Sequence, residues 1–208
     1  NKDQSYFLHR LDQAQFEHVL FPLGEMTKPE AAEYAKQIKL PVKFDSESQD
    51  LCFIDDRGYV PFLEKRRPDL RKDGPILDTR GREIGRHDGY YHFTVGQREG
   101  LNVPAAHRLY VREVRPETNA VIVGERDEIM SGGCAVDDVQ WIAGSAPPDG
   151  FACQVRLRYR HRGAEAVIRR VENRRVEVKF EEPQFAVTPG QAAVFYGGDE
   201  VLGGGWID

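Results

Sequence analysis

The spacing of apolar residues changes along the chain, from a helical period near the start to a period of two in the second half. Between Leu11 and Val19 the apolar residues lie on one rough helical face. Between Val155 and Arg162 every second residue is an arginine, and Val176 to Glu181 alternates in the same way. The pattern predicts a mostly β fold with an α-helical N-terminal piece.

Helix signals are confined to the first third of the chain. Thr27 and Glu30 have the spacing of a capping box, which predicts a helix from there to about Lys39 that ends before Pro41. A second, short helix is expected from Tyr59 to Lys65, bounded by Pro68.

Turn residues punctuate the middle of the chain. Asp73-Gly74-Pro75, Thr79-Arg80-Gly81 and His87-Asp88-Gly89 recur at intervals of about ten residues or fewer, a rhythm typical of a small β-rich unit. Periodicity is lost from Asn102 to His107, where we expect a linker.

From Arg108 onward the pattern is that of short strands. Residues 109–114 and 120–123 read as a hairpin, and several further strands in about 100 residues predict a small barrel or sandwich. The expected organisation is therefore a helical piece over residues 1–56, a small central domain over 57–106 and a β-barrel domain over 107–208.

Composition indicates where the protein resides and which bound groups to expect. The 208 residues carry a formal net charge of −5, no apolar run approaches the roughly 20 residues of a membrane-spanning helix, and no signal-peptide pattern opens the chain. Cys52, Cys134 and Cys153 are an odd number of widely spaced thiols without a zinc-like spacing. We expect a cytoplasmic, monomeric protein with no membrane partner and no bound metal.

Basic residues are concentrated in one stretch. Between Gln154 and Arg175 there are eight arginines against two acids, Glu165 and Glu172. Such a local block favours an anionic partner, and arginines spaced by two on a strand project about 6.5–7 Å apart, close to the spacing of phosphates. The alternative is a solvated face paired with acids such as Glu177 and Glu181.

Cys52 follows the polar and acidic run from Asp45 to Asp50, which favours a loop, the usual place for reactive groups. The alternative is a buried, inert thiol at the start of a strand, 51–54. Cys134, expected in a loop after Ser131-Gly132-Gly133, and Cys153, at the start of a strand, are expected to be structural.

Four stretches, in register from the first residue nearly to the last, resemble the bacterial tRNA-specific 2-thiouridylases. They are Asn1 to Leu8, Ser46 to Phe53, His92 to Leu101 and Val187 to Tyr196. The resemblance implies the tail of an α/β catalytic domain, a small β-rich central domain and a C-terminal six-stranded β-barrel.

The resemblance also implies a chemistry. In that family ATP (with Mg) adenylates the wobble uridine of tRNA, and a cysteine persulfide then delivers sulfur to carbon 2 and ends in a disulfide with a second cysteine. By motif match, Cys52 is the persulfide cysteine, charged by a sulfur-relay protein or a cysteine desulfurase. The family's Ser-Gly-Gly-Val-Asp-Ser nucleotide loop and first catalytic cysteine have no match, and Ser131-Gly132-Gly133 is read as a coincidence. The chain therefore resembles the C-terminal portion of a thiouridylase, without the ATP-binding half.

The same resemblance assigns tRNA-binding residues: Lys2, Asp3, Gln4, Arg158, Tyr159 and Gln191. Strict alternation puts Tyr159 on the face opposite the arginines, so it reaches the same RNA only at a bulge or strand end. The cluster from His92 to Arg98 either positions tRNA or only forms a tight turn at Gly96. The rival functions are a non-catalytic tRNA-binding module and a methyltransferase; for the latter, no glycine-rich loop after a strand is present.

Overall fold

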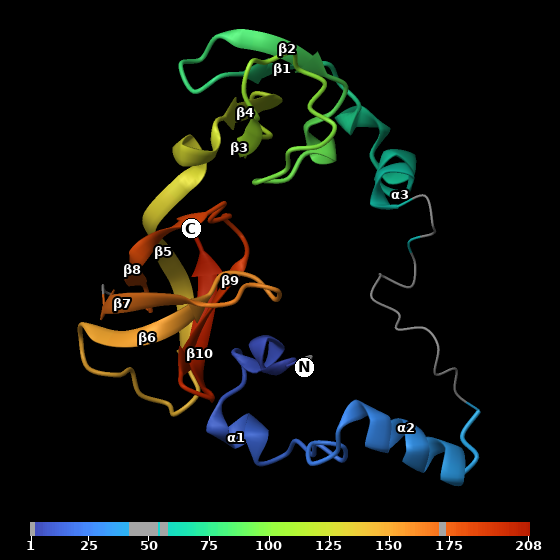
Figure 1. The fold of residues 1–208 in the computed structure, drawn as a ribbon, viewed down its shortest axis with the longest axis vertical. Helices are drawn as coiled ribbons and strands as arrows, with labels where there is room; N and C mark the ends of the chain where they lie inside the picture. The colour runs from blue at the N-terminus through green and yellow to red at the C-terminus, as the bar shows by residue number, and fades with distance from the viewer. Residues whose placement is uncertain (1–2, 42–53, 55–57, 171–173) are drawn as a thin grey trace. The chain divides into compact units, whose positions relative to one another are not determined.

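The structure is a computed structural model that describes residues 3–41, 54, 58–170 and 174–208. The chain divides into two compact units, one formed by Asn1–Gln13 and Asp69–Asp208 and the other by Ala14–Pro68 (Figure 1). The first unit contains all ten strands of the described residues, and the second is helical. The prediction of a mostly β fold with an α-helical N-terminal piece is confirmed.

The helical unit holds α1 (Gln13–Phe16), α2 (Lys28–Gln37) and α3 (Tyr59–Arg66). The predicted capping box starts α2, since the Thr27 backbone N–H donates to the Glu30 carboxylate at 2.7 Å. Helix α2 ends at Gln37 because Lys39 adopts a left-handed φ of 56°, so the backbone turns before Pro41 is reached. The predicted face from Leu11 to Val19 forms only the single turn of α1.

No helix among the described residues is long and apolar enough to cross a membrane.

A four-stranded sheet follows the η2 turn (Pro68–Leu70). Its strands are β1 (Gly74–Leu77), β2 (Glu83–His87), β3 (Tyr110–Arg115) and β4 (Ala120–Gly124), in the order β2-β1-β4-β3. All neighbours are antiparallel except β1 and β4, which run parallel. Ile76, Val111, Val121 and Val123 are fully buried at its centre.

The hairpin β3–β4 was predicted to belong to the barrel, and this prediction is wrong. Ile76 pairs with Val121 and Leu77 with Ile122, so the hairpin completes the sheet begun by β1 and β2. The side-chain amide of Asn119, in the hairpin turn, donates to the Lys72 and Asp73 carbonyls at 3.1 and 3.0 Å. The irregular stretch 102–107 is therefore a loop within one sheet rather than a linker between domains.

Before that loop, η3 (Tyr90–His92) leads into a tight turn. Gly96 takes a φ of 86°, its N–H donates to the Val111 carbonyl at 2.7 Å, and the Val111 N–H donates back to Gln97 at 2.8 Å. The Gln97 side chain accepts the Thr94 N–H at 2.9 Å. These contacts match the tight-turn reading of the cluster from His92 to Arg98.

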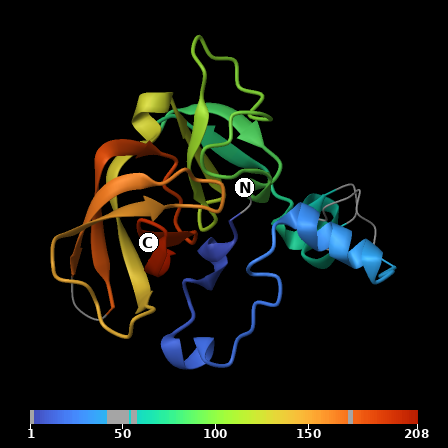
Figure 2. The same cartoon turned by 60° about the horizontal axis from the view of Figure 1, so that its bottom comes forward.

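After η4 (Arg126–Ile129), six strands close into an antiparallel barrel in the order β10-β5-β8-β7-β6-β9 (Figure 2). The strands are β5 (Met130–Trp141), β6 (Phe151–Arg156), β7 (Ala164–Arg170), β8 (Val176–Phe185), β9 (Ala192–Gly197) and β10 (Glu200–Ile207). Val136, Val155 and Phe195 are fully buried inside it. The six-stranded barrel implied by the resemblance is confirmed.

Two local predictions in the barrel are wrong. Cys134 lies within β5 instead of a loop, because β5 pairs with β8 from Met130 to Val136. The alternating stretch from Val155 to Arg162 is a strand only as far as Arg156. Since Val155 pairs with Ala164, the chain must reverse between them, and the His161 N–H closes this turn on the Arg158 carbonyl at 2.9 Å.

Candidate nucleic-acid interface

The first described residues dock on the barrel, where η1 (Ser5–Leu8) lies beside β10 (Figures 1 and 2). Tyr6 is buried, and its hydroxyl donates to the Ala192 carbonyl at 2.8 Å. His9 is also buried, with Nδ1 donating to the Tyr6 carbonyl at 2.8 Å. A Cβ on Gly204 would stand 2.9 Å from the His9 ring, so the glycine in β10 permits this close approach.

Asp3 anchors the start of this segment to the end of β6. One Asp3 oxygen accepts the Arg156 guanidinium at 2.9 Å, and the other accepts the Ser5 N–H at 2.8 Å. The Ser5 hydroxyl lies 3.2 Å from the Tyr196 hydroxyl, and the Arg156 guanidinium carbon lies 4.3 Å from the centre of the Tyr196 ring. Residues 153 positions apart are thus joined in one cluster.

The structure brings several of the predicted tRNA-binding residues to this cluster. Arg158 is exposed in the turn after β6, and Tyr159 packs its ring 5.0 Å from Phe7 and 6.3 Å from Tyr6. Because β6 has already ended, Tyr159 sits at a strand end, the position from which it was expected to reach the same RNA as the arginines. Gln191 immediately precedes Ala192, the acceptor of the Tyr6 hydroxyl.

Gln4 is exposed between Asp3 and Ser5. Two of the predicted site residues, Lys2 and Cys52, lie outside the described residues. The sequence pattern included Arg156 only as one of the alternating arginines expected to bind the tRNA backbone. Its pairing with Asp3, and the parts played by Tyr6 and Tyr196, were missed because these contacts join segments far apart in the chain.

The arginine block does not form one surface. Arg156, Arg158 and the residues to 162 lie where β6 passes into β7, whereas Arg174 and Arg175 lie where β7 passes into β8. Since β7 runs the length between the two turns, the groups lie at opposite ends of that strand.

The arginines between β7 and β8, Arg174 and Arg175, form ion pairs with aspartates. Arg175 contacts Asp137 at 2.6 Å and Asp208 at 2.7 Å, and Arg174 contacts Asp138 at 3.1 Å. The alternative of a solvated, acid-paired face therefore holds for Arg174 and Arg175.

The contacts fix the charge states within the cluster. The hydrogen bond from Ser5, together with the contact to Arg156, lowers the pKa of the Asp3 carboxyl, so it is ionised at neutral pH. Burial raises the pKa of Tyr6 to about 12, which keeps its hydroxyl a hydrogen-bond donor. The cluster therefore consists of an ionised Asp3–Arg156 pair beside protonated tyrosines.

Neither described cysteine has the character of a nucleophile. Burial raises the pKa values of both Cys134 and Cys153 to about 12, so both are protonated thiols at neutral pH. This is consistent with the structural role predicted for them.

The run Ser131-Gly132-Gly133 does not fit a bound nucleotide phosphate. It belongs to β5, where Ser131 and Gly133 pair with β8 on either side of a register shift, and a Cβ on Gly133 would stand 2.4 Å from the Val178 carbonyl. A phosphate needs consecutive backbone N–H groups that are free to converge on it. This part of the chain therefore does not fit ATP. Within residues 3–41, 54, 58–170 and 174–208, no three His, Cys, Asp or Glu side chains converge as metal ligands.

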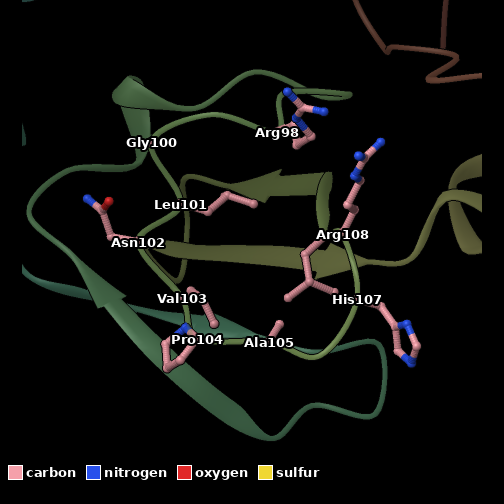
Figure 3. Close-up of a pocket in the computed structure, with 10 residues that line it drawn as sticks. Arg98, Gly100, Leu101, Asn102, Val103, Pro104, Ala105, His107 and Arg108 are labelled. Carbon is pink, nitrogen blue, oxygen red and sulfur yellow. The ribbon is translucent and has the colours of Figure 1, made fainter.

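A surface cavity of about 490 Å³ lies in the sheet region, lined by residues between Arg98 and Leu109. Figure 3 shows Arg98 and Arg108 extending toward the same side, with Leu101 and Val103 below them. The cavity combines an apolar floor with cationic side chains, and it was not anticipated from the sequence.

Three family profiles match consecutive parts of the chain. They are described as a tRNA methyl transferase HUP domain (residues 1–56), a tRNA methyl transferase PRC-barrel domain (61–125) and an aminomethyltransferase beta-barrel domain (131–207). The middle match extends past the hairpin β3–β4, in line with its place in the sheet. The fold and the three matches together place the chain in the class of proteins that share the domain organisation of these tRNA-modifying-enzyme profiles.

Relatives that match the whole chain narrow the class further. The tRNA-specific 2-thiouridylase MnmA of Geobacter metallireducens is 46% identical over 207 residues, covering 100% of the chain and 56% of the relative. The proteins of the same name from Carboxydothermus hydrogenoformans and Solibacter usitatus are 43% and 46% identical, with 57% and 58% of their lengths covered. The chain belongs to the tRNA-specific 2-thiouridylase family and matches the C-terminal part of its members. It spans somewhat more than half the length of these relatives.

Proposed function

We propose that this chain holds tRNA and carries sulfur within an enzyme that 2-thiolates the wobble uridine of tRNA. The observation that supports the proposal best is the contact between Asp3 and Arg156 at 2.9 Å. It brings the segment Asp3-Gln4 next to Arg158 and Tyr159, two stretches that resemble tRNA-binding stretches of the family. The relatives named for this activity support it over the whole chain.

In this proposal the sulfur-carrying group is a persulfide on Cys52. A thiolate is required both to accept sulfur from a cysteine desulfurase or sulfur-relay protein and to pass it on. Cys134 and Cys153 are held protonated by burial, which leaves Cys52 as the candidate among the three thiols of the sequence. Since Ser131-Gly132-Gly133 does not fit ATP, we place the activation of the uridine oxygen by ATP (with Mg) in the part of the relatives that the chain does not span.

The second candidate function is a non-catalytic tRNA-binding module. It is favoured by the chemistry of the cluster, in which arginines, tyrosines and amides serve binding and the nearby carboxylate is engaged by Arg156. Both functions require tRNA binding, and the reactivity of Cys52 separates them.

The test measures the affinity of the 208-residue chain for tRNA by fluorescence anisotropy, repeated across a series of salt concentrations. Arg158→Ala should weaken the binding of any tRNA and flatten the slope of log K against log[salt] by about 0.7–0.9, the value for one lost phosphate contact. The preference among tRNAs should not change, because phosphate contacts position the RNA without reading its sequence.

Arg175→Ala is the matched control, since Arg175 lies at the other end of β7 and is paired with Asp137 and Asp208. Affinity and slope should stay at the wild-type values in that variant. An equal loss in both variants would mean that the effect is general electrostatics, and no loss in Arg158→Ala would contradict the proposed surface.

A further inference from the structure

The acidic residue in the candidate tRNA-binding segment raises a physical question. A carboxylate at an RNA-binding surface repels phosphate groups, yet Asp3 is ionised and lies beside Arg156, at the end of β6. Its two oxygens are both occupied within the protein, one by the Ser5 N–H and the other by Arg156. The Asp3 carboxylate is therefore engaged in contacts within the protein, and Arg156 neutralises its charge.

Arg156 is held from two sides. Its side chain is 24% exposed, donates from Nη1 to Asp3, and lays its guanidinium over the Tyr196 ring at 4.3 Å. The Tyr196 hydroxyl in turn lies 3.2 Å from the hydroxyl of Ser5, two residues after Asp3. The planar guanidinium can stack on an aromatic face and donate from its edge at the same time, which a lysine ammonium cannot do.

The position of Arg156 gives this contact its significance. It is the last residue of β6, two positions before Arg158, and Val194 of β9 is its partner in the barrel ladder. Asp3 is followed directly by the exposed Gln4. The ion pair thus ties one part of the candidate RNA surface to the strand end that carries the other part.

We infer that Arg156 is a positioning residue that fastens the segment Asp3-Gln4-Ser5 to the barrel, so that two separate stretches bind tRNA as one site. The inference rests on the proposed function and adds a residue to it. A competing role for Arg156 is a direct contact with a tRNA phosphate, in which Asp3 would be a competitor of the RNA.

Asp3→Asn distinguishes the two roles by the sign of its effect. An asparagine has one carbonyl oxygen, which can accept from Ser5 or from Arg156 but not fully from both. If Arg156 fastens the segment, Asp3→Asn weakens tRNA binding at least about fivefold, a typical coupling between linked sites. If Arg156 contacts phosphate, the same variant binds tRNA more tightly, since a negative charge is removed and Arg156 is freed.

A double-mutant cycle supplies the second readout, again by anisotropy across a salt series with the 208-residue chain. Asp3→Asn, Arg156→Gln and the double variant should weaken binding to a similar extent, because each breaks the same contact. Their salt slopes should equal that of the wild type, in contrast to Arg158→Ala. Additive losses, or a slope flattened by Arg156→Gln, would overturn the inference.

A third readout does not depend on tRNA. Arg156→Gln should raise the deuterium uptake of a peptide covering residues 3–10 and leave a peptide from β8 (176–185) unchanged, and Arg156→Lys should give an intermediate uptake. Unchanged uptake in residues 3–10 would overturn the inference even if tRNA binds. If the wild-type chain does not bind tRNA at all, the proposed function fails, and the exchange data still decide whether Arg156 fastens the segment.

Discussion

At the scale of single residues, burial sets the chemistry of the two thiols that the structure describes. Burial raises the pKa values of Cys134 and Cys153 from an ordinary 9.0 to about 12, so the thiolate is disfavoured at both positions relative to an exposed cysteine. Because the folded-state pKa is raised, folding favours the protonated thiol. The stability it contributes is fully present below pH 9 and is lost as the pH rises toward 12.

The corresponding prediction concerns the thiols in the 2-thiolating enzyme of which this chain is proposed to be a part. Cys52→Ser should abolish 2-thiouridine while tRNA binding stays near the wild-type level, because sulfur needs a thiolate carrier and binding does not. Cys134→Ala and Cys153→Ala should retain thiolation. The measurement is mass spectrometry of nucleosides from the treated tRNA.

Alkylation provides the control for this prediction. At pH 8 the native 208-residue chain should take up one iodoacetamide adduct and the Cys52→Ser chain none, whereas three adducts should form in urea, one per cysteine of the sequence. Normal 2-thiouridine from the Cys52→Ser enzyme would show that another group carries the sulfur.

At the scale of elements, two adjacent glycines in β5 have opposite surroundings. A Cβ at Gly133 would stand 2.4 Å from the Val178 carbonyl of β8, whereas a Cβ at Gly132 would meet nothing within 4 Å. The register of the two strands shifts between Ser131 and Gly133, which brings the backbones close at Gly133. Replacing each glycine with alanine therefore distinguishes the effect of losing a glycine from the effect of disturbing the β5–β8 pairing.

Gly133→Ala should lower the free energy of unfolding by about 1–3 kcal/mol, since the added methyl forces β5 away from β8. Gly132→Ala, its neighbour, should change stability by less than about 1 kcal/mol and in the stabilising direction. Thermal and urea denaturation of the three chains measure the difference. Equal effects in the two variants would mean that the β5–β8 approach is not what requires Gly133.

At the scale of the whole chain, binding groups and the base-activating chemistry are proposed to reside in different parts of the enzyme. Consecutive backbone N–H groups are needed to cradle a nucleotide phosphate, whereas Ser131 and Gly133 pair with β8 within the sheet. Isothermal titration calorimetry of the 208-residue chain with Mg-ATP should therefore give no heat of binding, while tRNA gives a measurable one. Micromolar affinity for ATP would contradict this division.

Local signals in the sequence predicted the local structure well. The capping box at Thr27, the helix from Tyr59 and the hairpin β3–β4 each depend on residues a few positions apart, and each is present. The hairpin was assigned to the wrong unit because the parallel pairing of Ile76 with Val121 leaves no local pattern. The end of β6 at Arg156 was missed because burial continues to alternate through Leu157 after the ladder has ended.

In the candidate site, too, local features could be predicted from the sequence and long-range contacts could not. The resemblance supplied Asp3, Arg158, Tyr159 and Gln191, but the pairing of Asp3 with Arg156 depends on contacts between residues 153 positions apart. The eight arginines of the block look alike in the sequence, and only the course of β7 reveals that Arg174 and Arg175 face other partners. The resemblance selected the candidate residues, and the tertiary contacts show which of them lie together in the structure.

The order of strands in the barrel has a consequence for how the molecule is made. Strand β10 lies between β5 and β9, so the ring cannot close until residues 200–207 have left the ribosome. Until then β5 and β9 present open edges, the kind of surface on which nascent chains pair wrongly or aggregate. The docking of residues 5–9 also waits for Ala192 and Gly204, so this segment leaves the ribosome well before its native contacts on the barrel can form.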